Sequence, residues 1–238
     1  MREQNSIAFK REYFVAHKDR PFDFRHFAGL LRKRFPSSTA KTRLLDIGCG
    51  LGFFLRRVEP YFETYGLDIA VYAVEECRKR LNNTKLCIGD ASDLSLFEDS
   101  FFDVITAFGI LEHLETTKLN RCLKECERVL KQNGYLIATT PNLLSIHIKL
   151  RQSNWHGFSD KTHVSLNKPD AWAALFHSYG FQELEMYGSG LWDTPLFKHI
   201  PGWLQTLLIK APSCVLFSLG VKFPLKYSDG LVIIARKA

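Results

Sequence analysis

The segment RLLDIGCGLGFFL, residues 43–55, constrains the fold of this chain more than any other stretch. Its apolar start reads as a short buried strand, and alternating glycines follow at Gly48, Gly50 and Gly52. Glycine allows unusual backbone angles and a close approach, and the helix after such a turn begins with free backbone N–H groups. The segment therefore predicts a strand, a ligand-binding turn and a helix.

Strand and helix patterns alternate along the rest of the chain. Apolar runs predict strands at 43–48, 63–69, 85–90, 101–109 and 135–142, with two further strands at 181–188 and 228–238. Helical patterns lie between them at 52–62, 70–83, 119–131 and 168–181. This alternation predicts a parallel sheet covered by helices on both faces.

The helix predicted over 119–131 has the clearest apolar face. The side chains that share this face are Leu119, Cys122, Leu123, Cys126, Val129 and Leu130. Asn133-Gly134 predicts a left-handed cap that ends the helix.

The residues around the glycine turn indicate which ligand it holds. A dinucleotide turn needs a third glycine where this chain has Phe53, and it places a pyrophosphate on the helix. Asp46, two residues before Gly48, would repel a pyrophosphate and attract a cationic amino-acid head group. The turn therefore favours a ligand with an ammonium group and a ribose.

Two further acids stand at predicted strand ends. Asp68 ends the second strand, 20 residues after Gly48, where a carboxylate can accept both hydroxyls of a ribose. Asp90 ends the third strand and can accept from an exocyclic amine such as that of adenine. Each acid alone could instead cap a helix, but together with Asp46 they predict one crevice at the carboxyl edge of the sheet.

These motifs resemble those of class I S-adenosylmethionine (SAM)-dependent methyltransferases. DIGCGLG matches the first family motif, LDIA the acid after the second strand, and GDASDLSLFEDSFFDVITAFGILEHL the next two motifs, so the resemblance covers roughly residues 40–142. It implies a Rossmann-like, seven-stranded, mostly parallel sheet of order 3-2-1-4-5-7-6 with the last strand antiparallel. It also implies SAM as cofactor and S-adenosylhomocysteine as product.

The resemblance assigns roles to residues of this chain. It implies that Asp68 binds the ribose, that Asp90 binds the adenine amine and that the glycine turn meets the methionine part. Phe108-Gly109 would lie near the methyl group. The implied cofactor-binding residues are Asp46, Gly48, Cys49, Gly50, Gly52, Asp68, Ile69, Asp90, Ala91 and Phe108.

Two histidines are candidates for a general base, which assists when an acceptor hydroxyl must lose a proton. His113 lies in LEHL and His163 in DKTHVSL. A packing or capping role for His113, and a loop-holding hydrogen bond for His163, are equally open readings. His156, Trp155 and Asp160 are weaker candidates. Methyl transfer from a sulfonium needs no metal, and no metal site is expected at Cys122 and Cys126.

The acceptor is only partly constrained. Residues 107–110, AFGI, stand where adenine and glutamine amine methyltransferases carry Asn/Asp-Pro-Pro-Tyr, and no nucleophilic Cys follows a Pro as in cytosine C5 methylation. The segment from 154 to 205 resembles bacterial methyltransferases of surface-saccharide or lipid-linked glycan pathways. We therefore expect O-methylation of a small-molecule, saccharide or lipid-linked acceptor. A tRNA or RNA methyltransferase and a non-catalytic SAM-fold binding module remain as alternatives.

Charge and composition suggest how the chain is organised. The net charge of +7 permits an anionic partner, and we expect residues 1–40 to form a basic helical extension or cap, although a solvated helix face explains these charges equally well. Residues 41–238 would form the methyltransferase domain, with an apolar insert at 191–227 that is a lid, a partner surface, a membrane-touching element or core packing. The N-terminus lacks a signal-peptide core, so we expect a cytoplasmic protein, and one reading of the insert adds a peripheral contact with the membrane.

Overall fold

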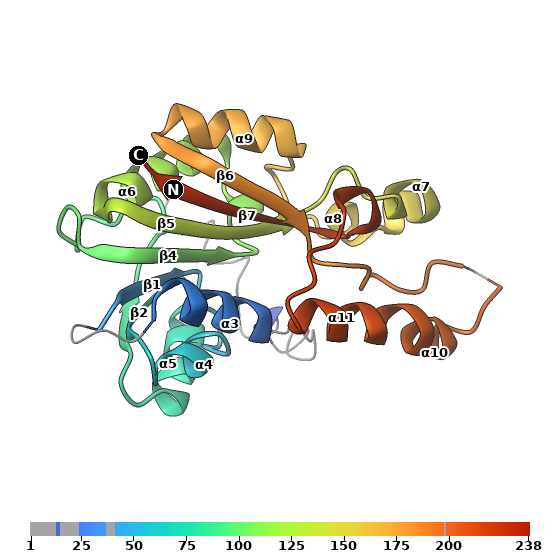
Figure 1. Ribbon diagram of the computed structural model, residues 1–238, viewed down its shortest axis with the longest axis horizontal. Coiled ribbons are helices and arrows are strands. Elements are labelled where there is room, and N and C mark those ends of the chain that lie inside the picture. The colour runs from blue at the N-terminus through green and yellow to red at the C-terminus, as the bar shows by residue number, and fades with distance from the viewer. Residues whose placement is uncertain (1–12, 15–23, 37–40, 198) are drawn as a thin grey trace.

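The computed structural model describes residues 13–14, 24–36, 41–197 and 199–238, and its centre is a seven-stranded sheet (Figure 1). The strand order is β3-β2-β1-β4-β5-β7-β6. Neighbours from β3 to β5 are parallel, whereas β7 runs antiparallel to both β5 and β6. The order and the reversed last strand confirm the predicted fold. The strands are β1 (Arg43–Ile47), β2 (Glu63–Asp68), β3 (Lys85–Ile88), β4 (Phe102–Phe108), β5 (Leu130–Pro141), β6 (Phe181–Gly188) and β7 (Gly230–Lys237).

Helices cover both faces of the sheet, as predicted (Figure 1). The α-helices are α3 (Arg25–Arg34), α4 (Leu55–Val58), α5 (Val71–Arg80), α6 (Thr116–Val129), α7 (His147–Arg151), α8 (His156–Ser159), α9 (Pro169–Ser178), α10 (Gly202–Gln205) and α11 (Ala211–Ser218). Short turns of other helix types are η1 (Leu111–His113), η2 (Gln152–Asn154), η3 (Thr206–Lys210) and η4 (Leu225–Tyr227). One core lies between the sheet and α6 with α9, and the other between the sheet and α3, α4 and α5.

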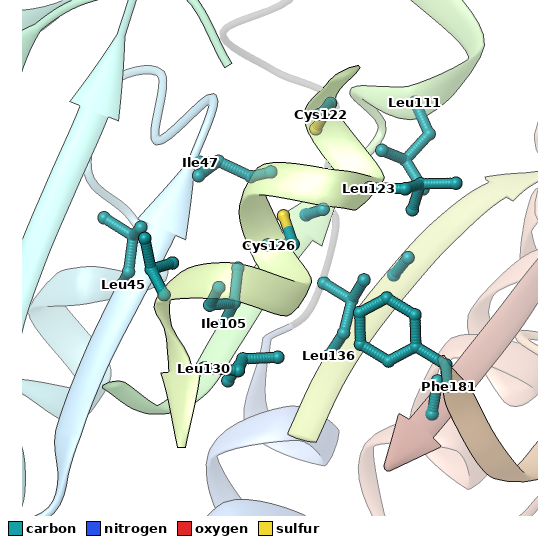
Figure 2. Packing of buried hydrophobic residues seen from close by; sticks show 14 of the residues in the cluster. Leu45, Ile47, Ile105, Leu111, Cys122, Leu123, Cys126, Leu130, Leu136 and Phe181 are labelled. Carbon is teal, nitrogen blue, oxygen red and sulfur yellow. The ribbon is translucent and has the colours of Figure 1, made fainter. Parts of the chain in front are cut away.

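Helix α6 buries the face that the sequence predicts. Cys122, Leu123 and Cys126 point toward side chains of the sheet such as Ile105 and Leu136 (Figure 2). Fully burying a side chain of this size stabilises the fold by about 1.5–3 kcal/mol. This face therefore fixes α6 on the sheet and, with it, the turn that precedes α6.

Two predicted helix boundaries are wrong. Leu130 does not continue α6 but begins β5, where it pairs with Phe102, and Asn133 adopts a φ of 64° inside that strand. The helix predicted over 52–62 is regular only over the single turn α4, although helical hydrogen bonds flank it: the N–H of Arg56 donates to the Gly52 carbonyl at 3.0 Å and that of Phe62 to the Val58 carbonyl at 3.1 Å. Strand pairing overrides the helical pattern at Leu130, whereas at 52–62 only the length of the regular helix differs.

The insert at 191–227 forms a helical arm. In Figure 1, α10 and α11 extend past the end of the sheet, on the side where α7 and α8 also lie. Phe217 of α11 stacks on His26 of α3, with 4.2 Å between the ring centroids, so the arm is attached to the domain through α3. No helix within the described residues has the length and apolar content needed to cross a membrane.

The basic extension predicted for 1–40 lies largely outside the described residues. Its described part is mainly α3, which buries Phe27 and Leu31 against the sheet. The division of the chain into extension, domain and insert stays a prediction.

Candidate functional site

The glycine turn follows β1 and is held against β2. The backbone N–H groups of Gly48 and Cys49 both donate to the carbonyl of Leu67, at 2.7 and 3.0 Å. Gly48, Gly50 and Gly52 have φ values of 67°, 51° and 76°, which other residues rarely adopt. The turn therefore has the backbone that the sequence predicts.

Asp46 is buried at the end of β1 and accepts a hydrogen bond of 2.7 Å from Thr106 Oγ1. Burial raises the pKa of Asp46 to about 7; the Thr106 hydrogen bond opposes this rise and the nearby charge of Asp68 adds to it. A cationic group beside this carboxyl would favour its ionised form. The environment of Asp46 thus suits the ammonium-bearing ligand predicted for the turn.

Asp68 supports the glycine turn directly. Its carboxylate accepts from the backbone N–H of Gly50 and of Ala70, each at 2.8 Å. Burial raises the pKa of Asp68, while these backbone hydrogen bonds act to lower it. Each carboxylate oxygen can accept more than one hydrogen bond, so the two ribose contacts predicted for Asp68 are compatible with this arrangement.

Asp90 follows β3 and is already ion-paired. Lys118 Nζ lies 2.7 Å from Oδ2, and the backbone N–H and hydroxyl of Ser92 donate to Oδ1. Although partial burial opposes it, these contacts lower the pKa of Asp90. Ile69 and Ala91 follow the two acids and are half-buried. The sheet brings the predicted cofactor residues to one edge, and their contacts with a cofactor stay predictions.

A cavity of about 360 Å³ opens beside this edge. It is lined by Tyr13, Phe24, Phe108, Gly109, Glu112, His113, Thr139, Thr140, Pro141, His156, Asp160, His163, Ser189, Trp192, Asp193, Cys214, Phe217 and Gly230. Phe108 and Gly109, predicted to lie near the methyl group, belong to the lining. The cavity is therefore placed to hold an acceptor next to the predicted cofactor site.

The two candidate bases meet in this cavity. The rings of His113 and His163 have their centroids 4.8 Å apart, although 50 residues separate them. Backbone hydrogen bonds join their segments, because the N–H groups of Val164 and Ser165 donate to the Glu112 carbonyl at 2.8 and 3.0 Å. The loop that carries His163 is thereby held against η1.

Hydrogen bonds fix the orientation of both rings. The Thr162 hydroxyl donates to Asp160 Oδ1 at 2.5 Å, so Thr162 Oγ1 accepts from Nδ1 of His113 at 2.9 Å. Nδ1 of His163 lies 2.9 Å from the carbonyl of Gly157 and donates to it. In both histidines Nδ1 therefore carries the proton, and Nε2 is the basic nitrogen.

Glu112 is a part of the site that sequence reasoning assigned no role. Its side chain is only 3% exposed, and Oε2 has no hydrogen-bond partner among the described residues. Burial raises the pKa of Glu112 to about 8; its own backbone N–H opposes this rise, and Asp160 adds to it. Its place beside His113 in the motif was visible in the sequence, but its burial was not.

The insert contributes residues that no motif revealed. Asp193 accepts from the backbone N–H of His156 at 2.9 Å and lines the cavity together with Trp192. Among the weaker candidates, His156 and Asp160 line the cavity, whereas Trp155 is fully buried outside it. These contacts join segments far apart in the chain, so local patterns could not reveal them.

Comparison with known proteins finds a family match for the central part of the chain. Residues 45–138 match the family model described as a methyltransferase domain. This matched segment contains the glycine turn, Asp68 and Asp90. A crystal structure of a SAM-dependent methyltransferase from Archaeoglobus fulgidus has the same fold, with a TM-score of 0.67 and 22% identity over 96% of this chain and 100% of that one.

Sequence relatives of the methyltransferase domain act on different acceptors. A demethylmenaquinone methyltransferase from Thermotoga maritima is 31% identical over 142 residues, which are 58% of this chain and 59% of the relative. A tRNA N(3)-methylcytidine methyltransferase from Drosophila melanogaster is 29% identical over 133 residues, which are 50% of this chain and 41% of the relative. The chain thus spans about half the length of these curated relatives.

Proposed function

We propose that this protein transfers a methyl group from SAM to a hydroxyl of a small-molecule, saccharide or lipid-linked acceptor. The observation that carries the proposal is the cavity beside Phe108-Gly109, into which His113 and His163 present their rings. The family match and the fold support SAM as the cofactor. Asp46, Asp68 and the glycine turn would hold it.

The chemistry is an in-line displacement. The acceptor oxygen forms a bond to the methyl carbon, the carbon–sulfur bond breaks, and its electron pair stays on sulfur to give S-adenosylhomocysteine. Holding the two reactants in line can lower the barrier by about 7–11 kcal/mol. The acceptor proton passes to Nε2 of His113 or His163, and Asp160 Oδ2, 3.8 Å from Nε2 of His163, would stabilise an imidazolium there.

The charge of the cavity limits the chemical groups that an acceptor can place in it. The described lining residues include three acids, Glu112, Asp160 and Asp193, and no Lys or Arg. Glu112 is mostly protonated at neutral pH because its pKa is about 8, and Asp193 is paired with Arg151, so Asp160 is the acid among them that would repel an anion. A phosphate or carboxylate would also find no Lys or Arg side chain in this lining to pair with. The part of the acceptor that enters the cavity is therefore a neutral group, packed against aromatic walls such as Trp192 and Phe217.

The helical arm supports a lipid-linked acceptor. Phe217 and Cys214 of α11 line the cavity, while the outer side of the arm exposes large apolar side chains such as Trp203 (70% exposed) and Leu219 (76% exposed). An exposed apolar surface of this kind suits the interface of a membrane. An acceptor anchored in lipid would then reach the cavity along α11.

Calorimetry with SAM and S-adenosylhomocysteine tests the cofactor part of the proposal. Asp68→Ala removes the ribose acceptor and the support of Gly50, so we expect no measurable binding. Asp170→Ala, which alters an exposed acid at the start of α9, should bind like the unaltered protein. Undiminished affinity in Asp68→Ala would contradict the proposed cofactor site.

Labelled-methyl transfer into fractionated cell extract tests the reaction itself. We expect label in a neutral or lipid fraction, and we expect the label to resist alkaline hydrolysis, because methylation of a hydroxyl gives an ether. Binding of SAM without transfer to any fraction would favour the non-catalytic module.

An RNA acceptor is the second candidate, favoured by the tRNA methyltransferase among the relatives and by the net charge of +7. Binding of tRNA that weakens steeply with salt, together with label in the RNA fraction, would support it. The acidic cavity argues against it.

A further inference from the structure

The three side chains Glu112, His113 and His163 form a cluster that the methyl transfer alone does not explain. Each offers a ligand atom, and these atoms all lie within 4.8 Å of one another. Two come from η1 and the third from the loop after α8, which the Glu112 carbonyl holds in place. The cluster is thus built by the fold and faces the cavity.

Both histidines have the surroundings of metal ligands. A ligating histidine usually donates its other ring N–H to a carbonyl or to a carboxylate-linked group, which fixes the tautomer. Here Nδ1 of His163 donates to the Gly157 carbonyl, and Nδ1 of His113 donates to Thr162, whose hydroxyl donates to Asp160. Nε2 of each ring then carries the lone pair that a metal ion needs.

Glu112 supplies the second observation. A buried carboxyl oxygen without a partner costs free energy, and Oε2 of Glu112 has none among the described residues. A cation between the carboxylate and the two imidazoles would satisfy it. The surroundings also favour a cation, because the carboxylate of Asp160 lines the same cavity and adds a negative charge near the cluster.

We propose that Glu112, His113 and His163 bind a first-row divalent metal ion at the cavity wall. Two imidazoles and one carboxylate are the protein ligands of many catalytic zinc and iron(II) sites, and they leave a position open for substrate. Bonds of about 2.0–2.2 Å place ligand atoms roughly 3.4 Å apart, so binding draws the three side chains together by about 1 Å.

The inference deepens the proposed function. The role of the ion in catalysis rests on the methyl transfer proposed above, whereas the binding of the ion does not. The acceptor hydroxyl would occupy the open position, where the ion lowers the pKa of that hydroxyl. Its proton leaves to solvent, the oxygen bonds to the methyl carbon, and the electron pair of the broken carbon–sulfur bond stays on sulfur. With the ion bound, His113 and His163 hold it, and the ion replaces the proton transfer to Nε2 that the metal-free reaction above assigns to one of these histidines.

Titration of the full-length, reduced protein with Co²⁺, followed by visible absorption and equilibrium dialysis, tests the site. We expect one ion per chain, with the spectrum of nitrogen and oxygen ligands. Glu112→Gln and His163→Gln should each weaken binding by at least about 100-fold. Thr162→Ala removes the hydroxyl that links His113 to Asp160 and should weaken binding by about 10–100-fold. His177→Gln, which alters a histidine on α9, should leave binding unchanged.

Several outcomes would overturn the metal site. One such outcome is that the protein fails to bind one Co²⁺ per chain, and a second is an absorption spectrum that shows cysteine sulfur bound to the Co²⁺. A third is that Glu112→Gln binds Co²⁺ as tightly as the unaltered protein. Calorimetry with S-adenosylhomocysteine on each variant confirms that it is folded. Methyl transfer that continues at full rate after metal removal would refute the metal inference alone, whereas bound Co²⁺ without any methyl transfer would refute the proposed function alone.

Discussion

At the scale of single residues, burial decides how the carboxyl groups of the site behave. Asp46 and Glu112 are both buried, and burial raises the pKa of each well above its ordinary value. Asp90 and Asp160 differ because hydrogen bonds from Lys118 or Thr162 outweigh their partial burial and lower the pKa of each. The edge of the sheet therefore holds acids of two kinds, and those with a raised pKa need a cationic partner to ionise near neutral pH.

This contrast predicts a pH-dependent cofactor affinity. With the pKa of Asp46 at about 7, the free protein is mostly protonated there below pH 7 and must lose that proton to bind a cationic head group. Affinity for SAM should rise roughly tenfold from pH 6 to pH 8. Calorimetry should show a smaller pH dependence for Asp46→Asn; an unchanged pH profile in that variant would mean that another group is responsible.

At the scale of elements, the glycine turn packs closely against helix α5. A Cβ added at Gly52 would lie 2.8 Å from Sγ of Cys77 and 3.1 Å from Cδ1 of Leu81 on the neighbouring helix α5 and its end. The turn can therefore approach α5 only because this position has no side chain. The same closeness leaves no room for substitution.

Gly52→Ala should destabilise the fold through both strain and crowding. The φ of 76° costs about 1–2 kcal/mol for alanine, and overpacking about 1–3 kcal/mol more. Gly29→Ala in α3, where a Cβ meets nothing within 4 Å, should instead stabilise by about 0.5–1 kcal/mol. Denaturant unfolding measures the free energy of unfolding of both variants. If Gly52→Ala is as stable as the unaltered protein, the turn adjusts to a side chain at this position without strain.

The helical arm is a second element whose role can be measured. Trp203, Leu207 and Leu219 are exposed on the arm. A double variant with Trp203→Ser and Leu207→Ser should bind anionic vesicles at least tenfold more weakly than the unaltered protein. Each substitution removes apolar surface that lipid would bury. Leu96→Ser, at an exposed site outside the arm, should change nothing. If the unaltered protein fails to sediment with vesicles, the arm serves another partner.

At the scale of the whole molecule, Asp229 joins the sheet to the cavity wall. It lies just before β7, is fully buried, and accepts from the backbone N–H groups of Trp192 and Asp193, both at 2.8 Å. Nδ1 of His147 lies 2.5 Å from its other oxygen. One carboxylate thus holds the start of the insert and α7 on the end of the sheet.

Asp229→Ala should cost roughly 3–5 kcal/mol of unfolding free energy, because it leaves His147 and two buried N–H groups without their acceptor. Asp99→Ala breaks the pair with Arg128 at an acid that is 76% exposed and should cost about 0–1 kcal/mol. Urea unfolding compares the two variants. Equal stabilities would show that the insert is held by its apolar contacts alone.

The sequence by itself determined the strands of the sheet. Hydrophobic runs, the glycine turn at 48–52 and acids such as Asp46 and Asp68 are local signals that predicted the strands and a crevice at their carboxyl ends. The strand order, which the structure confirms, was implied by the family resemblance that these motifs carry. Local signals failed at Leu130, where strand pairing with Phe102 ended a helix earlier than its periodicity indicates.

Only the tertiary structure decided what surrounds the acceptor. His163 meets His113 because the backbone N–H groups of 164 and 165 donate to the Glu112 carbonyl, and the Glu112 side chain beside them is buried. Asp229 likewise brings Trp192 to the cavity. Such contacts join residues about 40–50 positions apart, and their formation depends on the packing of the whole chain rather than on any local pattern.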